Sequence, residues 1–247
     1  MLSYDSPVSM KTMKTQNPTS PATMSNGHQN IPPSPKVVRL PTPALSNGVQ
    51  TNGAVSINGP KPEKERHIWL VTGPAGCGKS TVAKYLATVL NLPYIEGDEY
   101  HPQANIDKMS AGIPLTDADR WDWLTALRQA SLNELNNGKD GVVLTCSALK
   151  RKYRDVIRVA PYFMPRLHLH FIYLDASEEL ILQRVLARKN HYMGANMVHS
   201  QFDILERPTP DETDVLTIGV DRPLEAVMGD ALDRVLDTMD KIQTEAR

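Results

Sequence analysis

Residues 73–80 have the types and the spacing of a loop that binds phosphate groups. Their sequence, GPAGCGKS, fits the pattern G-x-x-x-x-G-K-[ST]. The glycines let the backbone curl so that successive N–H groups point at phosphate oxygens, and a helix beginning here adds the partial positive charge of its N-terminus. Lys79 would reach the β- and γ-phosphates of ATP and assist catalysis, and Ser80 would bind Mg²⁺. We predict that this phosphate loop binds ATP through Gly73, Pro74, Ala75, Gly76, Cys77, Gly78, Lys79, Ser80 and Thr81.

Two carboxylates, Glu96 and Asp98, follow the next apolar run one residue apart. Ligands of a parallel sheet sit at the carboxyl ends of its strands, so both would face the phosphate loop. One carboxylate can hold a water on Mg²⁺ while the other accepts the proton of an attacking hydroxyl. We predict that Asp98 is the catalytic base and contacts the substrate hydroxyl, and that Glu96 serves the metal. An acidic turn without catalysis is the alternative.

Three basic residues further along could hold an anionic substrate. Arg120 lies in the first turn of a predicted long helix, where a positive charge opposes the helix dipole. An anionic ligand would explain this placement, and an ion pair with Asp117 or Asp119 is the alternative. Lys150 and Arg154 are four residues apart on the next predicted helix and would share a face. Because arginine binds carboxylates through two parallel hydrogen bonds, a small acid is the predicted occupant, against a solvent-exposed basic face.

Arg184 and Arg188 are also spaced four residues apart, on a predicted helix whose other face is apolar. A short segment ending at Gly194 follows them. A helix that ends in arginines and such a loop is typical of a lid that closes over ATP and supplies charge in the transition state. We predict that Arg188 is catalytic and that Arg184 binds the nucleotide, with a solvated charged face as the alternative.

These residues need a scaffold, and the pattern from Arg66 onward predicts one. Short apolar runs alternate with amphipathic stretches, which indicates βα units on a parallel sheet. The predicted strands are 67–72, 93–96, 141–146, 167–174 and 215–220, the last three rich enough in Val, Ile and Leu to be covered on both faces. The predicted helices are 79–90, 103–111, 117–136, 148–159, 178–189, 197–206 and 224–244. The last helix has an apolar stripe from Leu224 to Ile242 that would pack on the sheet or pair two subunits.

Residues 1–64 differ in composition from the rest of the chain. They contain ten of the nineteen prolines and a single aromatic residue, Tyr4. Such a segment buries too little apolar surface to offset the entropy of ordering it. We predict a disordered low-complexity tail over 1–64 and one α/β domain over 65–247.

Net charge, apolar run length and cysteine count indicate which partners and which cellular compartment to expect. The formal net charge of −1 argues against nucleic acid, and no apolar run approaches the roughly 18 residues of a membrane span. Two cysteines, Cys77 and Cys146, fit a reducing compartment, so we expect a cytoplasmic protein. Because the Cys77 thiol lies inside the phosphate loop, we hypothesise that the protein is sensitive to oxidation.

The chain resembles the phosphate-loop gluconokinases over about residues 67 to 240. The matching segments are the phosphate loop, GDEYHP at 97–102, KM at 108–109 with GIPL at 112–115, DR at 119–120 with WL at 123–124, CSALK at 146–150 with YRD at 153–155, and DETDV at 211–215. The tail has no counterpart in the family pattern.

This resemblance implies ATP-dependent phosphorylation of D-gluconate at its 6-hydroxyl, giving 6-phosphogluconate for the pentose phosphate pathway. It also implies a three-layer P-loop NTPase fold with a five-stranded parallel sheet, like that of nucleoside monophosphate kinases, and a homodimer as in several members. Glu96 stands where many relatives have Asp. A shikimate-type kinase of the same fold and a non-catalytic nucleotide-binding regulator are the alternatives. The substrate-binding residues carried over are Asp98, His101, Arg120, Lys150 and Arg154.

Overall fold

The computed structural model describes residues 64–187 and 195–246. The predicted tail and its boundary near residue 64 therefore lie outside the described residues, as does Arg188.

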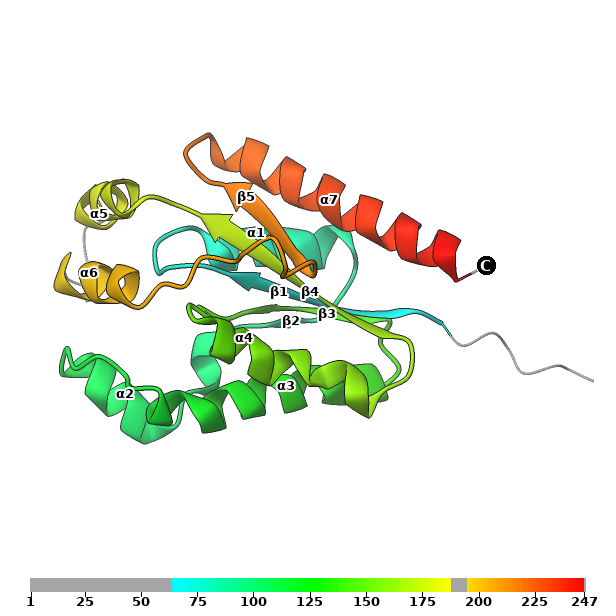
Figure 1. The fold of residues 1–247 in the computed structure, drawn as a ribbon, viewed down its shortest axis with the longest axis horizontal. Helices are drawn as coiled ribbons and strands as arrows, with labels where there is room; N and C mark the ends of the chain where they lie inside the picture. The colour runs from blue at the N-terminus through cyan, green and yellow to red at the C-terminus, as the bar shows by residue number, and fades with distance from the viewer. Residues whose placement is uncertain (1–63, 188–194, 247) are drawn as a thin grey trace, which may run out of the picture. The chain divides into compact units, whose positions relative to one another are not determined.

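A single five-stranded sheet forms the centre of the described part (Figure 1). Its strand order is β2-β3-β1-β4-β5, and each neighbouring pair is parallel. All five predicted strands are present, which confirms the predicted α/β class. The strands are β1 (Arg66–Thr72), β2 (Tyr94–Ile95), β3 (Gly141–Thr145), β4 (Leu167–Asp175) and β5 (Val215–Gly219).

Helices cover both faces of this sheet and make three layers (Figure 1). On one face lie α3 (Trp121–Asn136) and α4 (Arg151–Arg158), and on the other lie α1 (Lys79–Val89) and α7 (Leu224–Glu245). The remaining helices, toward the carboxyl ends of the strands, are α2 (Gln103–Ser110), α5 (Glu178–Ala187) and α6 (Ala195–Asp203). Short 3₁₀ turns occur at Gly97–Tyr100, Ala118–Arg120 and Ala160–Phe163.

The central strand β1 explains why the sheet is stable between two helical layers. Four consecutive residues, Ile68, Trp69, Leu70 and Val71, are fully buried, and their side chains alternate between the two apolar clusters on either face. The edge strand β5 differs from prediction, because only Ile218 of its five residues is buried. A strand at the edge of a sheet has one neighbouring strand and less helical cover, so β5 is less buried than its Val, Ile and Leu content predicted.

Two predicted helix starts are wrong, and both lie near the candidate site. The helix predicted from residue 117 begins as the 3₁₀ turn Ala118–Arg120 and becomes α3 only at Trp121. The helix predicted from residue 148 begins at Arg151, because Ala148 has a φ of 38° and Lys150 is extended. Residues 146–150 therefore form a turn, called the acceptor turn below.

Part of the apolar stripe of α7 packs on the sheet, which was one of the two predictions for it. Val227, Ala231 and Val235 are buried in the cluster that also contains residues of α1 and β1, while Leu224 is exposed. Pairing of two subunits through the rest of the helix stays a prediction.

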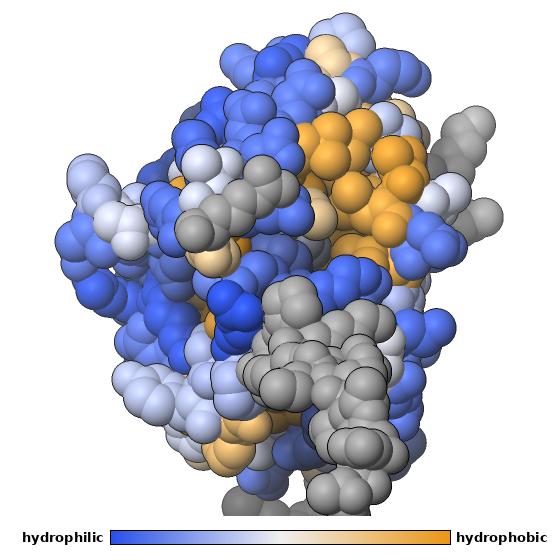
Figure 2. Space-filling model, turned by 90° about the vertical axis from the view of Figure 1, so that its right-hand side faces the viewer, coloured by the Kyte–Doolittle hydropathy of each residue, from blue (hydrophilic) through white to orange (hydrophobic). Residues whose placement is uncertain are grey.

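The face at the amino ends of the strands carries a patch of apolar side chains within a hydrophilic surface (Figure 2). A cavity of about 870 Å³ opens at these strand ends and is lined in part by Trp69, Leu90, Leu92 and Met239. It lies at the opposite end of the sheet from the phosphate loop. None of the described helices is long and apolar enough to cross a bilayer.

Candidate active site

The phosphate loop connects β1 to α1 in the conformation that its glycines predicted. Gly73, Gly76 and Gly78 have φ values of 139°, 88° and 105°. A Cβ on Gly73 would lie 2.8 Å from the carbonyl oxygen of Leu174, so this position requires glycine for space as well as for conformation. The Lys79 ammonium donates hydrogen bonds to the carbonyls of Gly73 (3.0 Å) and Pro74 (3.1 Å), which hold it over the loop.

Glu96 lies beside Ser80, as the predicted metal role requires. Burial alone would raise the pKa of this carboxyl, but hydrogen bonds from Thr145, Tyr94 and Ser80 outweigh burial and lower it. The carboxylate is therefore ionised at neutral pH. A hydroxyl and a carboxylate next to a phosphate loop form the kind of all-oxygen donor set that Mg²⁺ prefers, with phosphate oxygens and waters completing it. The residues present fit the ion.

Gly97 fixes the segment that carries Asp98. Its N–H donates to Thr145 Oγ1 (3.0 Å), and its carbonyl accepts from Trp123 Nε1 (2.7 Å). A Cβ here would lie 1.9 Å from the Thr145 carbonyl oxygen, so the end of β2 approaches the end of β3 more closely than any other residue would allow. Asp98 follows directly and is exposed to solvent.

His101 is buried against Trp123, with 4.0 Å between the ring centroids. Its Nδ1 lies 3.4 Å from the Asn105 side-chain nitrogen. Burial lowers the pKa of His101, and the charge of Arg120 adds to this effect while that of Asp98 opposes it. The imidazole is therefore neutral at pH 7 and can offer a hydrogen bond without adding charge to the site.

Cys146, at the start of the acceptor turn, marks the point where the predicted residues converge. Burial raises the pKa of its thiol to about 12, and the charges of Lys79, Asp98 and Arg120 all act on it. The first of these residues belongs to the phosphate loop, the second follows β2 and the third precedes α3. Hydrogen bonds fix this arrangement: the Gly73 N–H donates to the Ser147 carbonyl (3.4 Å) and the Gly97 N–H donates to Thr145 Oγ1 (3.0 Å). The phosphate loop, the segment that carries Asp98 and the acceptor turn therefore meet at the carboxyl ends of the central strands.

Arg120 and Lys150 flank the ring of Tyr153. The Arg120 guanidinium carbon lies 5.3 Å, and the Lys150 ammonium 5.7 Å, from the ring centroid. Arg120 donates to backbone carbonyls of the preceding turn, including that of Thr116 at 3.1 Å. Asp117 accepts from Lys150 (3.0 Å) and Asp119 from Lys108 (2.6 Å), and in the described part of the chain neither carboxylate forms the ion pair with Arg120 that was the alternative.

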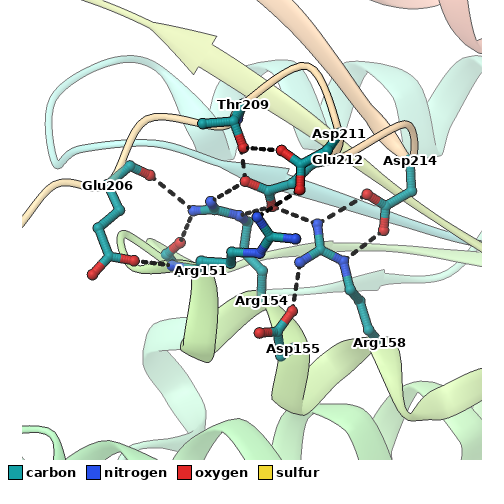
Figure 3. Close-up of polar contacts among 10 residues, drawn as sticks. Arg151, Arg154, Asp155, Arg158, Glu206, Thr209, Asp211, Glu212 and Asp214 are labelled. Atoms are coloured by element: carbon teal, nitrogen blue, oxygen red, sulfur yellow. Dashed lines mark hydrogen bonds and ion pairs between the residues drawn. The ribbon is translucent and has the colours of Figure 1, made fainter.

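Arg154 does not lie in the cleft, contrary to the prediction. Its side chain turns inward, is buried, and binds the Glu212 carboxylate through Nε (2.8 Å) and Nη2 (2.6 Å), as Figure 3 shows. The i,i+4 argument fails because Lys150 precedes α4 in an extended conformation and does not share a helical face with Arg154. In this arrangement the guanidinium is occupied by Glu212, and the predicted contact between Arg154 and substrate stays untested.

A second cavity, of about 340 Å³, lies beside the phosphate loop and suits the nucleoside part of ATP. Arg184, which was predicted to bind the nucleotide, lines this cavity, and its guanidinium donates to the carbonyl of Val220. Sequence reasoning missed Val220, Arg222 and Leu224, which also line it. Their position directly after β5 was the available signal, because ligands gather at the carboxyl ends of strands.

Gln201 was also missed. Its side-chain oxygen accepts a hydrogen bond from the Ala75 N–H at 2.8 Å, so α6 contacts the phosphate loop directly. The sequence predicted only a short helix here.

The side chain of Cys77, within the phosphate loop, is buried, which bears on the hypothesis that the protein is sensitive to oxidation. Burial raises the pKa of the thiol, although the charges of Lys79 and Arg184 oppose this effect. A protonated, buried thiol reacts slowly with oxidants because the thiolate is the reactive form. The structure therefore argues against that hypothesis.

Comparison with known proteins identifies the family. A family model described as "AAA domain" matches residues 70–201, more than half of the chain. A probable gluconokinase of Schizosaccharomyces pombe is 50% identical over 177 residues, covering 71% of this chain and 91% of that protein. The chain belongs to the gluconokinase family. The thermoresistant gluconokinase of Escherichia coli is 40% identical over 169 residues, which are 68% of this chain and 93% of that protein.

A solved member of the gluconokinase family has the same fold. The crystal structure of a gluconokinase from Sinorhizobium meliloti superimposes with a TM-score of 0.65 at 34% identity, and the match covers 75% of this chain and all of that one. The resemblance to phosphate-loop gluconokinases and the predicted P-loop fold are thus confirmed. Use of ATP follows from family and loop together.

Proposed function

We propose that this protein transfers the γ-phosphoryl group of ATP to the 6-hydroxyl of D-gluconate, with Mg²⁺ as cofactor. The product is 6-phosphogluconate, which feeds the pentose phosphate pathway. The observation that carries the proposal is that the start of the phosphate loop, at Gly73, and the segment before Asp98, at Gly97, are both hydrogen-bonded to residues 145–147, in a chain of the gluconokinase family. Phosphoryl transfer needs little covalent chemistry from a protein and depends on positioning and charge.

The donor half of the reaction belongs to the phosphate loop. The Lys79 ammonium would exchange the carbonyls of Gly73 and Pro74 for phosphate oxygens when ATP binds. Ser80 and Glu96 would hold Mg²⁺, which neutralises charge on the β- and γ-phosphates. Arg184 borders the nucleoside cavity, and Arg188, outside the described residues, keeps its proposed role in the transition state.

The acceptor half is proposed to lie between Asp98 and the pair Arg120 and Lys150. Asp98 would take the proton of the 6-hydroxyl as it attacks phosphorus, because an exposed carboxylate after β2 can approach a bound sugar. Arg120 and Lys150 would bind the gluconate carboxylate. The neutral imidazole of His101, fixed by Trp123, would orient a hydroxyl.

The setting of the enzyme is also part of the proposal. Both cysteines are buried free thiols, which fits a reducing compartment such as the cytoplasm. A homodimer is proposed from the resemblance alone.

Turnover with single acceptors tests the proposal. Purified full-length protein, Mg-ATP and one acceptor at a time are followed by ADP release, and the product is checked by its reduction of NADP⁺ with 6-phosphogluconate dehydrogenase. We expect turnover with gluconate and none with shikimate or AMP. Turnover with shikimate alone would instead establish the shikimate-type alternative. Nucleotide binding without turnover of any sugar acid would favour a regulator.

A further inference from the structure

We propose that Arg154 and Glu212 are positioning residues that hold the acceptor turn, residues 146–150, and thereby set the affinity for the acceptor. This inference rests on the proposed function, since it assigns a role within the same site. It replaces the direct substrate contact predicted for Arg154. Glu212 had been given no role.

The two side chains form a buried ion pair that joins distant parts of the chain. Each side chain is 2% exposed, and the pair links α4 to the segment before β5, 58 residues away (Figure 3). Arg158 donates to the same carboxylate at 2.6 Å, and the Thr209 N–H does so at 3.3 Å. A charge pair so buried is costly to desolvate and costly to break, so its presence at this position calls for a local reason.

That reason is the geometry of the acceptor turn. Ala148 is buried with a φ of 38°, a left-handed conformation that costs a residue with a Cβ about 1 kcal/mol or more. The third nitrogen of the Arg154 guanidinium, Nη1, donates to the Ala148 carbonyl (3.3 Å) and to the Glu206 carbonyl (3.1 Å). The Glu206 N–H in turn donates to the Leu149 carbonyl at 2.8 Å. Arg154 thus closes a ring of contacts around the strained residue, and Glu212 fixes Arg154.

The acceptor turn contacts both the phosphate loop and the residues proposed to bind the acceptor. At its start, the Ser147 carbonyl accepts from Thr72 Oγ1 (2.6 Å) and from the Gly73 N–H (3.4 Å), at the beginning of the phosphate loop. At its end, Lys150 pairs with Asp117. Displacement of the turn would therefore move Lys150 relative to the phosphate loop. The loop itself is held independently by its glycines and by Lys79, so nucleotide binding should depend less on the ion pair.

Conservative variants in the full-length protein test this proposal. Arg154→Lys keeps the charge but loses the fork that reaches one carboxylate and two carbonyls, and Glu212→Asp keeps the charge but withdraws it by one methylene. We expect each variant to raise KM for gluconate about tenfold while the Kd of a non-hydrolysable ATP analogue changes less than about twofold. Asp211→Asn is the matched control: it removes an ion pair between the same segment and the same helix, with Arg151, in which both side chains are well exposed, at 61% and 49%. This variant should keep the wild-type KM.

A purely structural role predicts a different result. If both variants melt at lower temperature but, below that temperature, keep the wild-type KM for gluconate, the ion pair does not position the acceptor site. An equal loss of affinity for gluconate and nucleotide would also overturn the proposal. Wild-type turnover is measured first; if wild type phosphorylates another acid, the same comparison is made with that acid. Failure of the proposed substrate is thereby distinguished from failure of the positioning role.

Discussion

Acidification from pH 7 to pH 5 should destabilise the protein through two histidines that lie far from the phosphate loop. His67 and His170 stack with Trp69 on β1 and β4, with 5.5 Å between the His67 and Trp69 ring centroids and 4.6 Å between those of Trp69 and His170. One nitrogen of each imidazole is buried without a hydrogen-bond partner in the described structure. Burial, followed by the charges of neighbouring histidines, lowers the pKa of each from 6.5 to about 4.

The sign and size of the effect follow from proton linkage. Between pH 6.5 and pH 4 the unfolded chain binds protons that the folded protein excludes, so stability is present above pH 6.5 and falls as pH decreases toward 4. With pKa values of 6.5 unfolded and about 4 folded, each histidine lowers the free energy of unfolding by about 2 kcal/mol from pH 7 to pH 5. Most carboxylates bind few protons between pH 7 and pH 5 and so contribute little to this change in stability. Glu212 is an example: burial would raise its pKa, but hydrogen bonds from Arg154 and Arg158 lower it to about 2.

Urea unfolding at pH 7, 6 and 5, followed by circular dichroism, measures this effect. His170→Phe keeps an aromatic ring against Trp69 and removes one titrating group, so its stability should fall by about 2 kcal/mol less than that of wild type over this range. His199→Gln is the control, because His199 is exposed and a hydrogen bond from its ring to Glu178 raises its pKa. If His170→Phe loses as much stability as wild type between pH 7 and pH 5, the reasoning is refuted.

Three further predictions concern the site. Asp98→Asn should lower kcat roughly 10²–10⁴-fold with ATP binding retained, as measured by steady-state kinetics and calorimetry, and normal turnover would remove Asp98 from the mechanism. Gly97→Ala, whose Cβ would lie 1.9 Å from the Thr145 carbonyl oxygen, should destabilise the fold by about 1–3 kcal/mol in urea unfolding, whereas Gly229→Ala in the open environment of α7 should not; equal stabilities would contradict the close approach. EDTA should abolish turnover and Mg²⁺ restore it, and Glu96→Gln should raise the Mg²⁺ concentration needed; an unchanged requirement would exclude Glu96 from the metal site.

The strands and the phosphate loop were predictable because their information is local. Apolar runs of the right length bounded by turn residues identify strands, and the loop pattern fixes its own conformation through three glycines. The expected positions of Glu96 and Asp98 followed from one rule about the carboxyl ends of parallel strands. These inferences need no knowledge of which segments meet.

Side-chain direction was not predictable where a distant partner decides it. Nothing near Arg154 in sequence indicates that Glu212, 58 residues away, turns it into the interior. Helical periodicity was applied across residue 150, where the chain is in fact extended, and so gave the wrong face. Gln201 was missed for the same reason, because its partner is the backbone of Ala75, 126 residues away.

The three tryptophans of the chain occupy unequal environments, which gives the protein an optical readout of its own. Trp69 is buried at the far end of the sheet from the phosphate loop, whereas Trp123 stacks on His101 and Trp121 meets the edge of the Tyr153 ring at 5.8 Å between centroids. Two of the three fluorophores thus adjoin the groups proposed to hold the acceptor, and the third supplies a constant background. Intrinsic emission should therefore report acceptor binding without a label, and the Trp123→Phe variant should lose the part of that signal that arises beside His101 while its overall fluorescence persists.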